Sequence, residues 1–130
     1  EIESARAYLA MASGDAATTV GHAKRALELI PLDDHIRRGP AASLLGLAHW
    51  TTGDLEAAHE SLAEGMASFA RAGNVLFSIS GVFGLADIRI AQGRLHDGIS
   101  DYQQALSLAL QHGGRALYGI ADLHLGLSEL

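Results

Sequence analysis

Small residues recur along this chain at a spacing of about 40, and this spacing restricts the fold more than any other feature. Gly14, Gly53 and Gly93 each close a short apolar stretch, and they lie 39 and 40 residues apart. A second series shares this spacing and contains only alanine or glycine, namely Ala7, Gly46, Ala86 and Gly126. Two features with one period predict repeated units, and a period of about 40 is typical of stacked helical pairs. Such arrays present a surface, so we expect neither enzyme activity nor catalytic residues.

The composition favours packed α-helices. Of the 130 residues, 48% are apolar but only 5% are aromatic, so alanine and leucine supply most of the apolar side chains. Both have high helix propensity, and alanine lets helices approach closely. The two prolines, Pro31 and Pro40, flank one linker and leave the rest of the chain free to be helical. We expect a single all-α domain.

Charge and residue usage exclude several kinds of site. The net charge is −6, and the largest clusters of basic residues are short pairs such as Arg37-Arg38, so we expect no direct contact with nucleic acid. There is no cysteine, and the seven histidines contain no pair at i and i+4, so we expect no metal and no cofactor. The carboxylates at helical spacing are expected on solvated faces: Asp97 and Asp101, and Glu56, Glu60 and Glu64.

No segment predicts secretion or insertion into a membrane. Glu1 and Glu3 stand where a signal peptide carries positive charge. The most apolar window, 75–86, is much shorter than the roughly 20 residues that span a bilayer. We expect a cytoplasmic protein that makes no membrane contact.

Seven helices are expected, at about 2–13, 15–30, 36–52, 54–72, 75–92, 94–112 and 115–130. The three spaced glycines end helices in a left-handed conformation, and Asp15 and Asp54 cap the helices that follow. The short turns make each pair an antiparallel hairpin, whereas longer links near Pro31 and Gly73 join one pair to the next. The single domain, 1–130, therefore divides into repeats at about 1–35, 36–73 and 74–113 and a half repeat at 114–130. Since neither end carries a helix start or stop signal, we expect a fragment of a longer protein.

The repeated residues resemble the tetratricopeptide repeat (TPR). The second unit matches it at Leu45, Gly46, His49, Gly53, Ala58 and Leu62, and the third at Leu85, Ala86, Gly93, Tyr102 and Ala105. The first unit supplies Ala26 and Pro31, and Leu125-Gly126 begins a fourth. Gly98 departs from the usual alanine, and the period of about 40 is longer than the standard 34. The resemblance implies a superhelical array of antiparallel helical pairs.

The longer period and the strings GDLEAAHESLAEGMASFARAGN, GLADIRIAQGRLHDGISDYQQALSLALQHG and LHLGLSEL resemble one branch of that repeat family. They are similar to the sensor region of the MalT-type, ATP-dependent, LuxR-family transcriptional regulators of bacteria. This resemblance implies a signal-sensing domain that binds an inducer or an inhibitory protein between an ATP-binding module and a helix-turn-helix domain. The chain itself contains neither a GxxxxGK[ST] loop nor a basic recognition helix.

The TPR motif also implies which residues face the concave groove. One column contains Tyr8, Leu47, Asp87 and Leu127, a second contains Met11, Trp50, Ile90 and Leu130, and a deeper third contains Ser4, Ser43, Phe83 and Leu123. Apolar walls with a few polar groups suit a peptide or a small ligand. Trp50, Tyr8 and Phe83 are candidate anchors, and Asp87 is a candidate partner for an amine, hydroxyl or arginine. Alternatively, Trp50 packs against a neighbouring helix and Asp87 pairs with Arg89 or another arginine.

Two further expectations concern partners. The effector is either a small molecule or a protein, and its differential affinity for two arrangements of the array transmits the signal. The alternative function is an adaptor whose groove holds a partner peptide, unconnected with transcription. Terminal repeats need polar caps, so the exposed leucines of the last helix predict self-association through terminal helices.

Overall fold

The computed structural model describes residues 1–112, and within them every regular element is an α-helix. None of these helices is long and apolar enough to cross a membrane. The expected helix at 115–130 lies outside the described residues, together with Gly126, Leu123, Leu125, Leu127 and Leu130. The described elements are α1 (Ile2–Ala12), α2 (Ala16–Leu29), α3 (His35–Thr52), α4 (Leu55–Arg71), α5 (Val75–Ser80), α6 (Val82–Ala91) and α7 (Leu95–His112).

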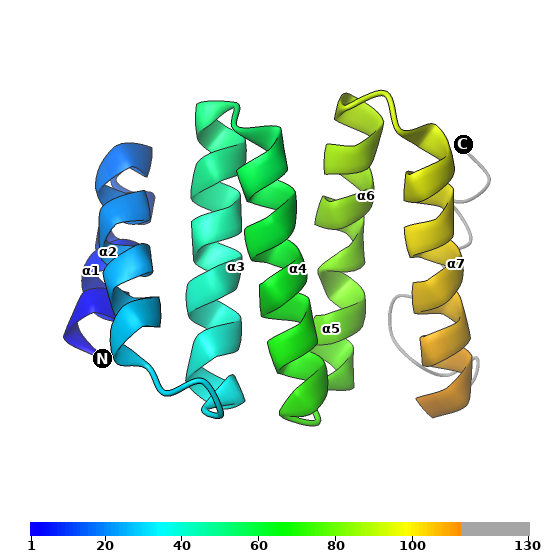
Figure 1. Cartoon of the computed structure of the whole chain (residues 1–130), viewed down its shortest axis with the longest axis horizontal. Helices are drawn as coiled ribbons and strands as arrows, with labels where there is room; N and C mark the ends of the chain where they lie inside the picture. The colour runs from blue at the N-terminus through cyan, green and yellow to red at the C-terminus, as the bar shows by residue number, and fades with distance from the viewer. Residues whose placement is uncertain (113–130) are drawn as a thin grey trace.

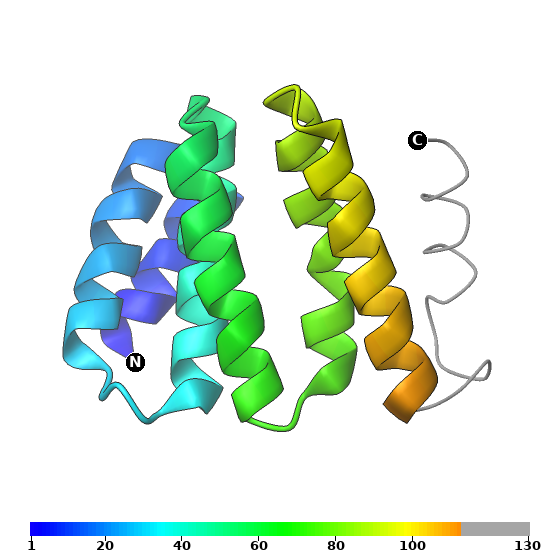
Figure 2. The same ribbon diagram turned by 45° about the vertical axis from the view of Figure 1, so that its right-hand side comes forward.

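The helices form two layers of antiparallel pairs (Figures 1 and 2). One layer contains α1, α3 and the α5–α6 rod, and the other contains α2, α4 and α7. Each second helix also packs on the first helix of the next pair, because α2 contacts α3 and α4 contacts both α5 and α6. The buried apolar residues correspondingly form several small clusters along the stack instead of one closed centre. The predicted all-α, TPR-like array of helical pairs is confirmed.

The turns between helices follow the predicted pattern of a glycine and a capping residue. Asp15 and Asp54 accept hydrogen bonds from the backbone N–H groups three residues later, at 3.0 and 3.2 Å. The turn glycines have positive φ angles of 75° to 84°, which only glycine adopts without strain: Gly14, Gly53, Gly73 and Gly93. Gly73 was expected in a longer link, but Asn74 caps the next helix here as the aspartates do elsewhere. The second and third pairs are thus joined by the same short turn that closes each hairpin.

The link between the first two pairs is different, because Pro31 follows the end of α2. Proline has no N–H, so the carbonyl of Leu27 loses the partner that a continuing helix would supply. Arg38 on α3 replaces it, donating to the carbonyl oxygens of Leu27 and Ile30 at 3.0 and 3.1 Å. The same guanidinium donates to Glu64 on α4 at 2.7 Å. Arg38 is only 9% exposed, so a buried cation holds the first pair to the second.

The single helix expected at 75–92 is divided at Gly81 into α5 and α6. The backbone of Gly81 stays right-handed, with φ −71° and ψ −16°, so the two pieces continue one rod. The bonds on either side are long, since Gly81 N–H to Phe77 O and Leu85 N–H to Gly81 O both measure 3.2 Å. A Cβ added to Gly81 would lie 1.6 Å from the sulfur of Met66 on α4. The irregularity therefore coincides with a very close approach of α4.

The three described members of the mid-helix series, Ala7, Gly46 and Ala86, have the predicted role of allowing close helix approach. Ala7 and Ala86 are completely buried. A Cβ added to Gly46 would lie 2.8 Å from the backbone nitrogen of Leu62 and 3.0 Å from the carbonyl of Ala58. Backbone atoms cannot move aside as a flexible side chain can, so only glycine fits where α4 crosses α3.

Candidate binding groove

A hollow of about 430 Å³ runs along the layer that contains α1, α3 and the α5–α6 rod, and we name it the inner groove. Its lining comes from all three pairs: Tyr8 on α1, Pro40, Ser43, Leu44 and Leu47 on α3, and Phe77, Ser80, Gly81 and Gly84 on the rod. Leu62, Met66 and Phe69 of α4 complete it. An adjoining hollow is lined by Met11, Leu47, Trp50 and Thr51. A ligand in the inner groove would therefore touch every pair that the structure describes.

Three of the predicted groove residues line the inner groove directly. Tyr8 and Leu47 are 51% and 43% exposed, which leaves apolar surface available to a ligand. Ser43 of the deeper column lines it as well. Ser4 lies in a neighbouring hollow that also includes Tyr8. The first two repeats thus place their predicted residues near one another.

Met11 and Trp50 occupy the adjoining hollow and also contribute to packing. Met11 is half-buried against the cluster that contains Ala7 and Leu44. Trp50 is half-buried against the cluster of α4 and α6, and its ring atom Cζ3 lies 3.7 Å from where a Cβ on Gly84 would be. Packing against a neighbouring helix and lining a hollow are both present at Trp50.

The structure does not bring the third repeat's predicted residues into the inner groove. Phe83 packs edge-on against Tyr102 of α7, with ring centroids 5.7 Å apart. Ile90 also lies against α7, since its Cγ1 is 3.4 Å from where a Cβ on Gly98 would be. Asp87 is exposed and takes part in none of the ion pairs found within residues 1–112.

The reason is that a groove between two helices is lined by the sides that face each other. On α3 this is the side with Ser43 and Leu47, which faces the following pair. On the rod it is the opposite side, with Phe77 and Gly84, which faces the preceding pair. Residues at equivalent positions of successive repeats therefore lie on different walls of the groove. For this reason the residues of one predicted column do not all line the same groove.

Phe69 and Phe77 are groove residues that the sequence pattern missed. Their rings stack with centroids 5.3 Å apart, and Phe77 remains 54% exposed. Gly39 makes room for the Phe69 ring, because a Cβ there would lie 3.0 Å from two ring carbons. The spacing of Phe77, Gly81 and Gly84 by four and three residues was the available signal that they share one face of the rod.

The inner groove is apolar and uncharged. Every described residue that lines it lacks a formal charge, and its polar side-chain groups are the hydroxyls of Tyr8, Ser43 and Ser80. Each serine hydroxyl donates to a carbonyl of its own helix, Ser43 to Gly39 at 2.8 Å and Ser80 to Phe77 at 3.1 Å. The oxygen lone pairs can still accept hydrogen bonds. The chemistry suits an uncharged ligand with apolar surface and a few donors.

Several shifted carboxyl groups away from the groove have structural roles. Hydrogen bonds from Thr18 lower the pKa of Asp15, and those from Arg37 lower the pKa of Asp34. Both aspartates cap helices, and the hydrogen bonds that lower these pKa values are the ones that stabilise the helix starts. Within residues 1–112, no group of three or more histidine, cysteine or acidic residues is placed to hold a metal ion.

Asp101 differs from the solvated carboxylate that was expected. Asp97, one turn earlier, pairs with Arg94 at 2.6 Å near the surface. The Oδ2 atom of Asp101 is shielded from solvent and has no hydrogen-bond partner, and burial raises the pKa of this carboxyl. The nearby imidazole of His59 on α4 is similarly buried, which lowers its pKa, and Arg89 lowers it further. The Asp101 prediction was wrong because helical spacing does not reveal which face a neighbouring helix covers.

The glutamates on α4 have mixed surroundings. Glu56 accepts a hydrogen bond from Gln92, the C-cap of α6, at 3.0 Å, and Glu64 pairs with Arg38. Glu60 is exposed, as the predicted solvated face requires. Two of the three therefore connect elements instead of only facing water.

The chain matches a protein-family model over residues 1–130, and that family is described as the MalT-like TPR region. No curated protein and no solved structure matches the chain.

Proposed function

Because the chain belongs to the family of MalT-like TPR regions, we propose that it is the non-catalytic, signal-sensing domain of a bacterial transcriptional regulator. Its effector, a small molecule or a segment of a partner protein, binds in the inner groove. The domain makes no direct contact with nucleic acid or membrane, and it works in the cytoplasm. The observation that supports this most directly is an uncharged, largely apolar groove to which all three helical pairs contribute.

The groove's position supports a mechanism of signal transmission. Tyr8 belongs to the first pair, Leu47 to the second and Phe77 to the third, so one ligand contacts helices that can shift relative to each other. A ligand that fits one arrangement better than another increases the population of that arrangement by its difference in affinity. The curvature of the array is the property that a flanking domain would sense.

A thermal-shift screen of residues 1–130 against uncharged sugars, metabolites and peptides tests the proposal. A ligand that binds only the folded state stabilises it by about 2.7 kcal/mol at 100 times its Kd. Truncating an aromatic anchor, by Phe77→Ala or Tyr8→Ala, should weaken binding about tenfold or more. Leu110→Ala is the matched control, because Leu110 is 48% exposed on α7 and does not line the inner groove.

The outcomes separate the candidate functions. A hit that loses affinity with the groove variants and keeps it with Leu110→Ala supports the sensor. Binding confined to peptides would favour an adaptor that holds a partner's tail. A ligand that binds both groove variants as tightly as the wild type would contradict the proposal that the inner groove is the effector site.

A further inference from the structure

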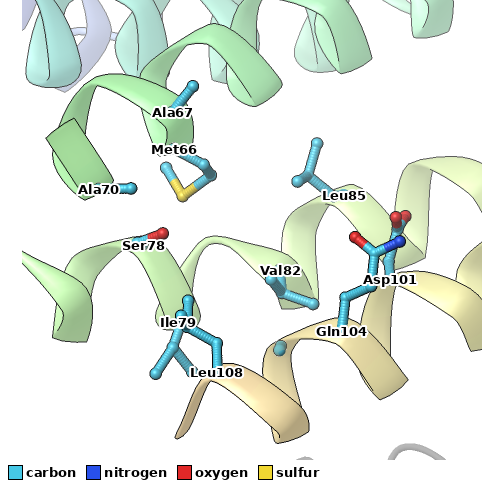
Figure 3. A pocket seen from close by; sticks show the side chains of 11 residues that line it. Met66, Ala67, Ala70, Ser78, Ile79, Val82, Leu85, Asp101, Gln104 and Leu108 are labelled. Atoms are coloured by element: carbon cyan, nitrogen blue, oxygen red, sulfur yellow. The ribbon is translucent and has the colours of Figure 1, made fainter. Parts of the chain in front are cut away.

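A second hollow lies between α4 and α7, across the α5–α6 rod, and we name it the α4–α7 cavity (Figure 3). It measures about 360 Å³, within the range of small-molecule sites. Met66, Ile79 and Leu85 provide apolar walls, and Asp101 and Gln104 are polar residues that α7 contributes. Figure 3 shows the side chains of Asp101 and Gln104 rising from α7 toward Leu85, with Met66 on α4 across the cavity.

The preceding repeat shows what fills the equivalent place. The repeat spacing of 40 that relates Gly46 to Ala86 also relates Arg38 to Ser78 and Glu64 to Gln104. In the earlier repeat, the Arg38 guanidinium reaches across and donates to Glu64 at 2.7 Å. In the later repeat, the equivalent residues are a buried serine and a glutamine, and both line the cavity. The space that a cationic side chain occupies in one repeat is thus left open in the next.

An unpaired acceptor lies at the same place. The Oδ2 atom of Asp101 is shielded from solvent without a hydrogen-bond partner, an arrangement that costs free energy until a donor arrives. None of its basic neighbours, His59, Arg89 and Arg94, supplies that donor, and the buried His59 Nε2 and Arg89 Nε atoms themselves have no hydrogen-bond partner. Arg94 is paired with Asp97 at 2.6 Å, and Arg89, although close enough to influence Asp101, forms no ion pair with it.

We propose that the α4–α7 cavity binds a small organic cation, a guanidinium or ammonium head on an apolar stem. The head donates N–H groups to Asp101 and to the side-chain oxygen of Gln104. The stem lies against Met66, Ile79 and Leu85, as the methylenes of Arg38 accompany its guanidinium in the preceding repeat. The ligand lies between the second helices of two consecutive pairs, so it stabilises one separation of α4 from α7. This site is separate from the effector site in the inner groove, although Met66 lines both.

Titration of the isotope-labelled chain with n-butylguanidinium at neutral pH, followed by backbone amide NMR, tests the proposal. Saturable shifts are expected at Ser78 and Gln104 and not at Tyr8 or Leu47. The uncharged probe 1-pentanol and the anion pentanoate should bind at least tenfold more weakly, because neither carries a positive charge to pair with a carboxylate. Equal shifts from all three probes, or no saturation below about 10 mM butylguanidinium, would overturn it.

A pair of matched variants isolates the carboxylate. Asp101→Asn keeps the size of the side chain and removes the charge, so butylguanidinium should bind at least tenfold more weakly. Asp97→Asn makes the same change one turn away, where Arg94 is the partner, and should leave the affinity unchanged. Equal affinity in Asp101→Asn and the wild type would exclude the proposed head-group site.

A filling variant provides a second readout. Ser78→Arg combined with Gln104→Glu recreates the Arg38–Glu64 pair of the preceding repeat. We expect this double variant to remain helical by circular dichroism and to lose all saturable shifts with butylguanidinium. Unchanged binding in a folded double variant would place the ligand elsewhere and overturn the proposal. If the double variant does not fold, the comparison of Asp101→Asn with Asp97→Asn decides it.

Discussion

The two joints between successive helical pairs are built differently, although the repeat makes them equivalent. At the first joint, a buried arginine, Arg38, connects the end of α2 to α3 and α4 through three hydrogen bonds of 2.7 to 3.1 Å. At the second joint, Gly81 and Gly84 let α4 approach the α5–α6 rod, and Met66 fills the space beside Gly81. Directional bonds fix the first joint, whereas flexible side chains against glycines leave the second room to adjust. We therefore expect changes in curvature to occur mainly between the second and third pairs.

The largest expected effect comes from removing the cation of the first joint. Arg38→Met leaves the carbonyls of Leu27 and Ile30 without their donor, and each buried unsatisfied group costs about 1–3 kcal/mol. We expect the free energy of unfolding in urea to fall by about 3 kcal/mol. Arg37→Met is the control, because Arg37 is half-exposed in a surface pair with Asp34 and should matter by less than about 1 kcal/mol. Similar losses in the free energy of unfolding for Arg38→Met and Arg37→Met would contradict the claim that the buried Arg38 fixes the first joint.

A smaller effect is expected from adding one methyl group at the second joint. In Gly81→Ala the new Cβ displaces Met66, which can change rotamer, so we expect a loss of about 1 kcal/mol in thermal or urea unfolding. Gly21→Ala on α2 is the matched control, because nothing lies within 4 Å of the added Cβ. It should stabilise by up to about 1 kcal/mol through helix propensity alone. A loss of more than about 3 kcal/mol in Gly81→Ala would mean that the second joint is as rigid as the first.

The stability of the second joint should also depend on pH, and His59 and Asp101 should contribute to this dependence in opposite directions. Burial lowers the pKa of His59 below its ordinary 6.5, so the unfolded chain takes up a proton at this histidine more readily than the folded chain does. The free energy of unfolding therefore falls as the pH drops below 6.5. Burial raises the pKa of Asp101 above 3.8, so the cost of ionising it is present above its folded pKa and is relieved on acidification. His59→Gln should therefore flatten the stability curve below neutral pH, measured by urea unfolding at a series of pH values. A variant curve parallel to the wild-type curve would contradict this.

The smallest effect concerns the outer face of the first pair. Ile2 and Leu9 are 68% and 71% exposed, whereas their equivalents in the second repeat, Ala41 and Ala48, are buried, and Ala41 packs against Ala26 and Ile30 of the first repeat. This open face is our candidate for the predicted self-association with a second copy of the chain. Sedimentation should show weak, concentration-dependent association that Leu9→Glu removes, with a change in stability within about 0.5 kcal/mol. A wild-type chain that stays monomeric at the highest concentration would contradict it.

The parts of the fold that sequence predicted are those that local chemistry determines. Gly14 and Gly53 adopt the backbone that only glycine tolerates, and Asp15 and Asp54 satisfy free N–H groups, so turns and caps follow from neighbouring residues. The repeat spacing then predicts which helices pair. Each of these features involves residues close in the chain or related by one period.

The parts that sequence missed depend on which side a neighbouring helix covers. Phe83 was predicted to face the groove and Phe77 was not, yet Phe77 lines the inner groove and Phe83 packs against Tyr102 of α7. Asp101 is shielded while Asp97 is near the surface, although the two are one turn apart. Arg38 looked like half of a short basic pair, and only the missing N–H of Pro31 hinted at its role. These differences arise from the orientation of helices in the stack, which no single segment specifies.

The half-buried Trp50 lies at the second joint, and it is the one tryptophan in the chain. Indole fluorescence shifts in wavelength and intensity when the polarity around the ring changes, and here the ring packs between α3 and α6 beside Gly84. The protein thus contains its own optical probe at the place where we expect it to bend. Emission spectra of the unlabelled chain can follow such movements in real time, without a chemical dye.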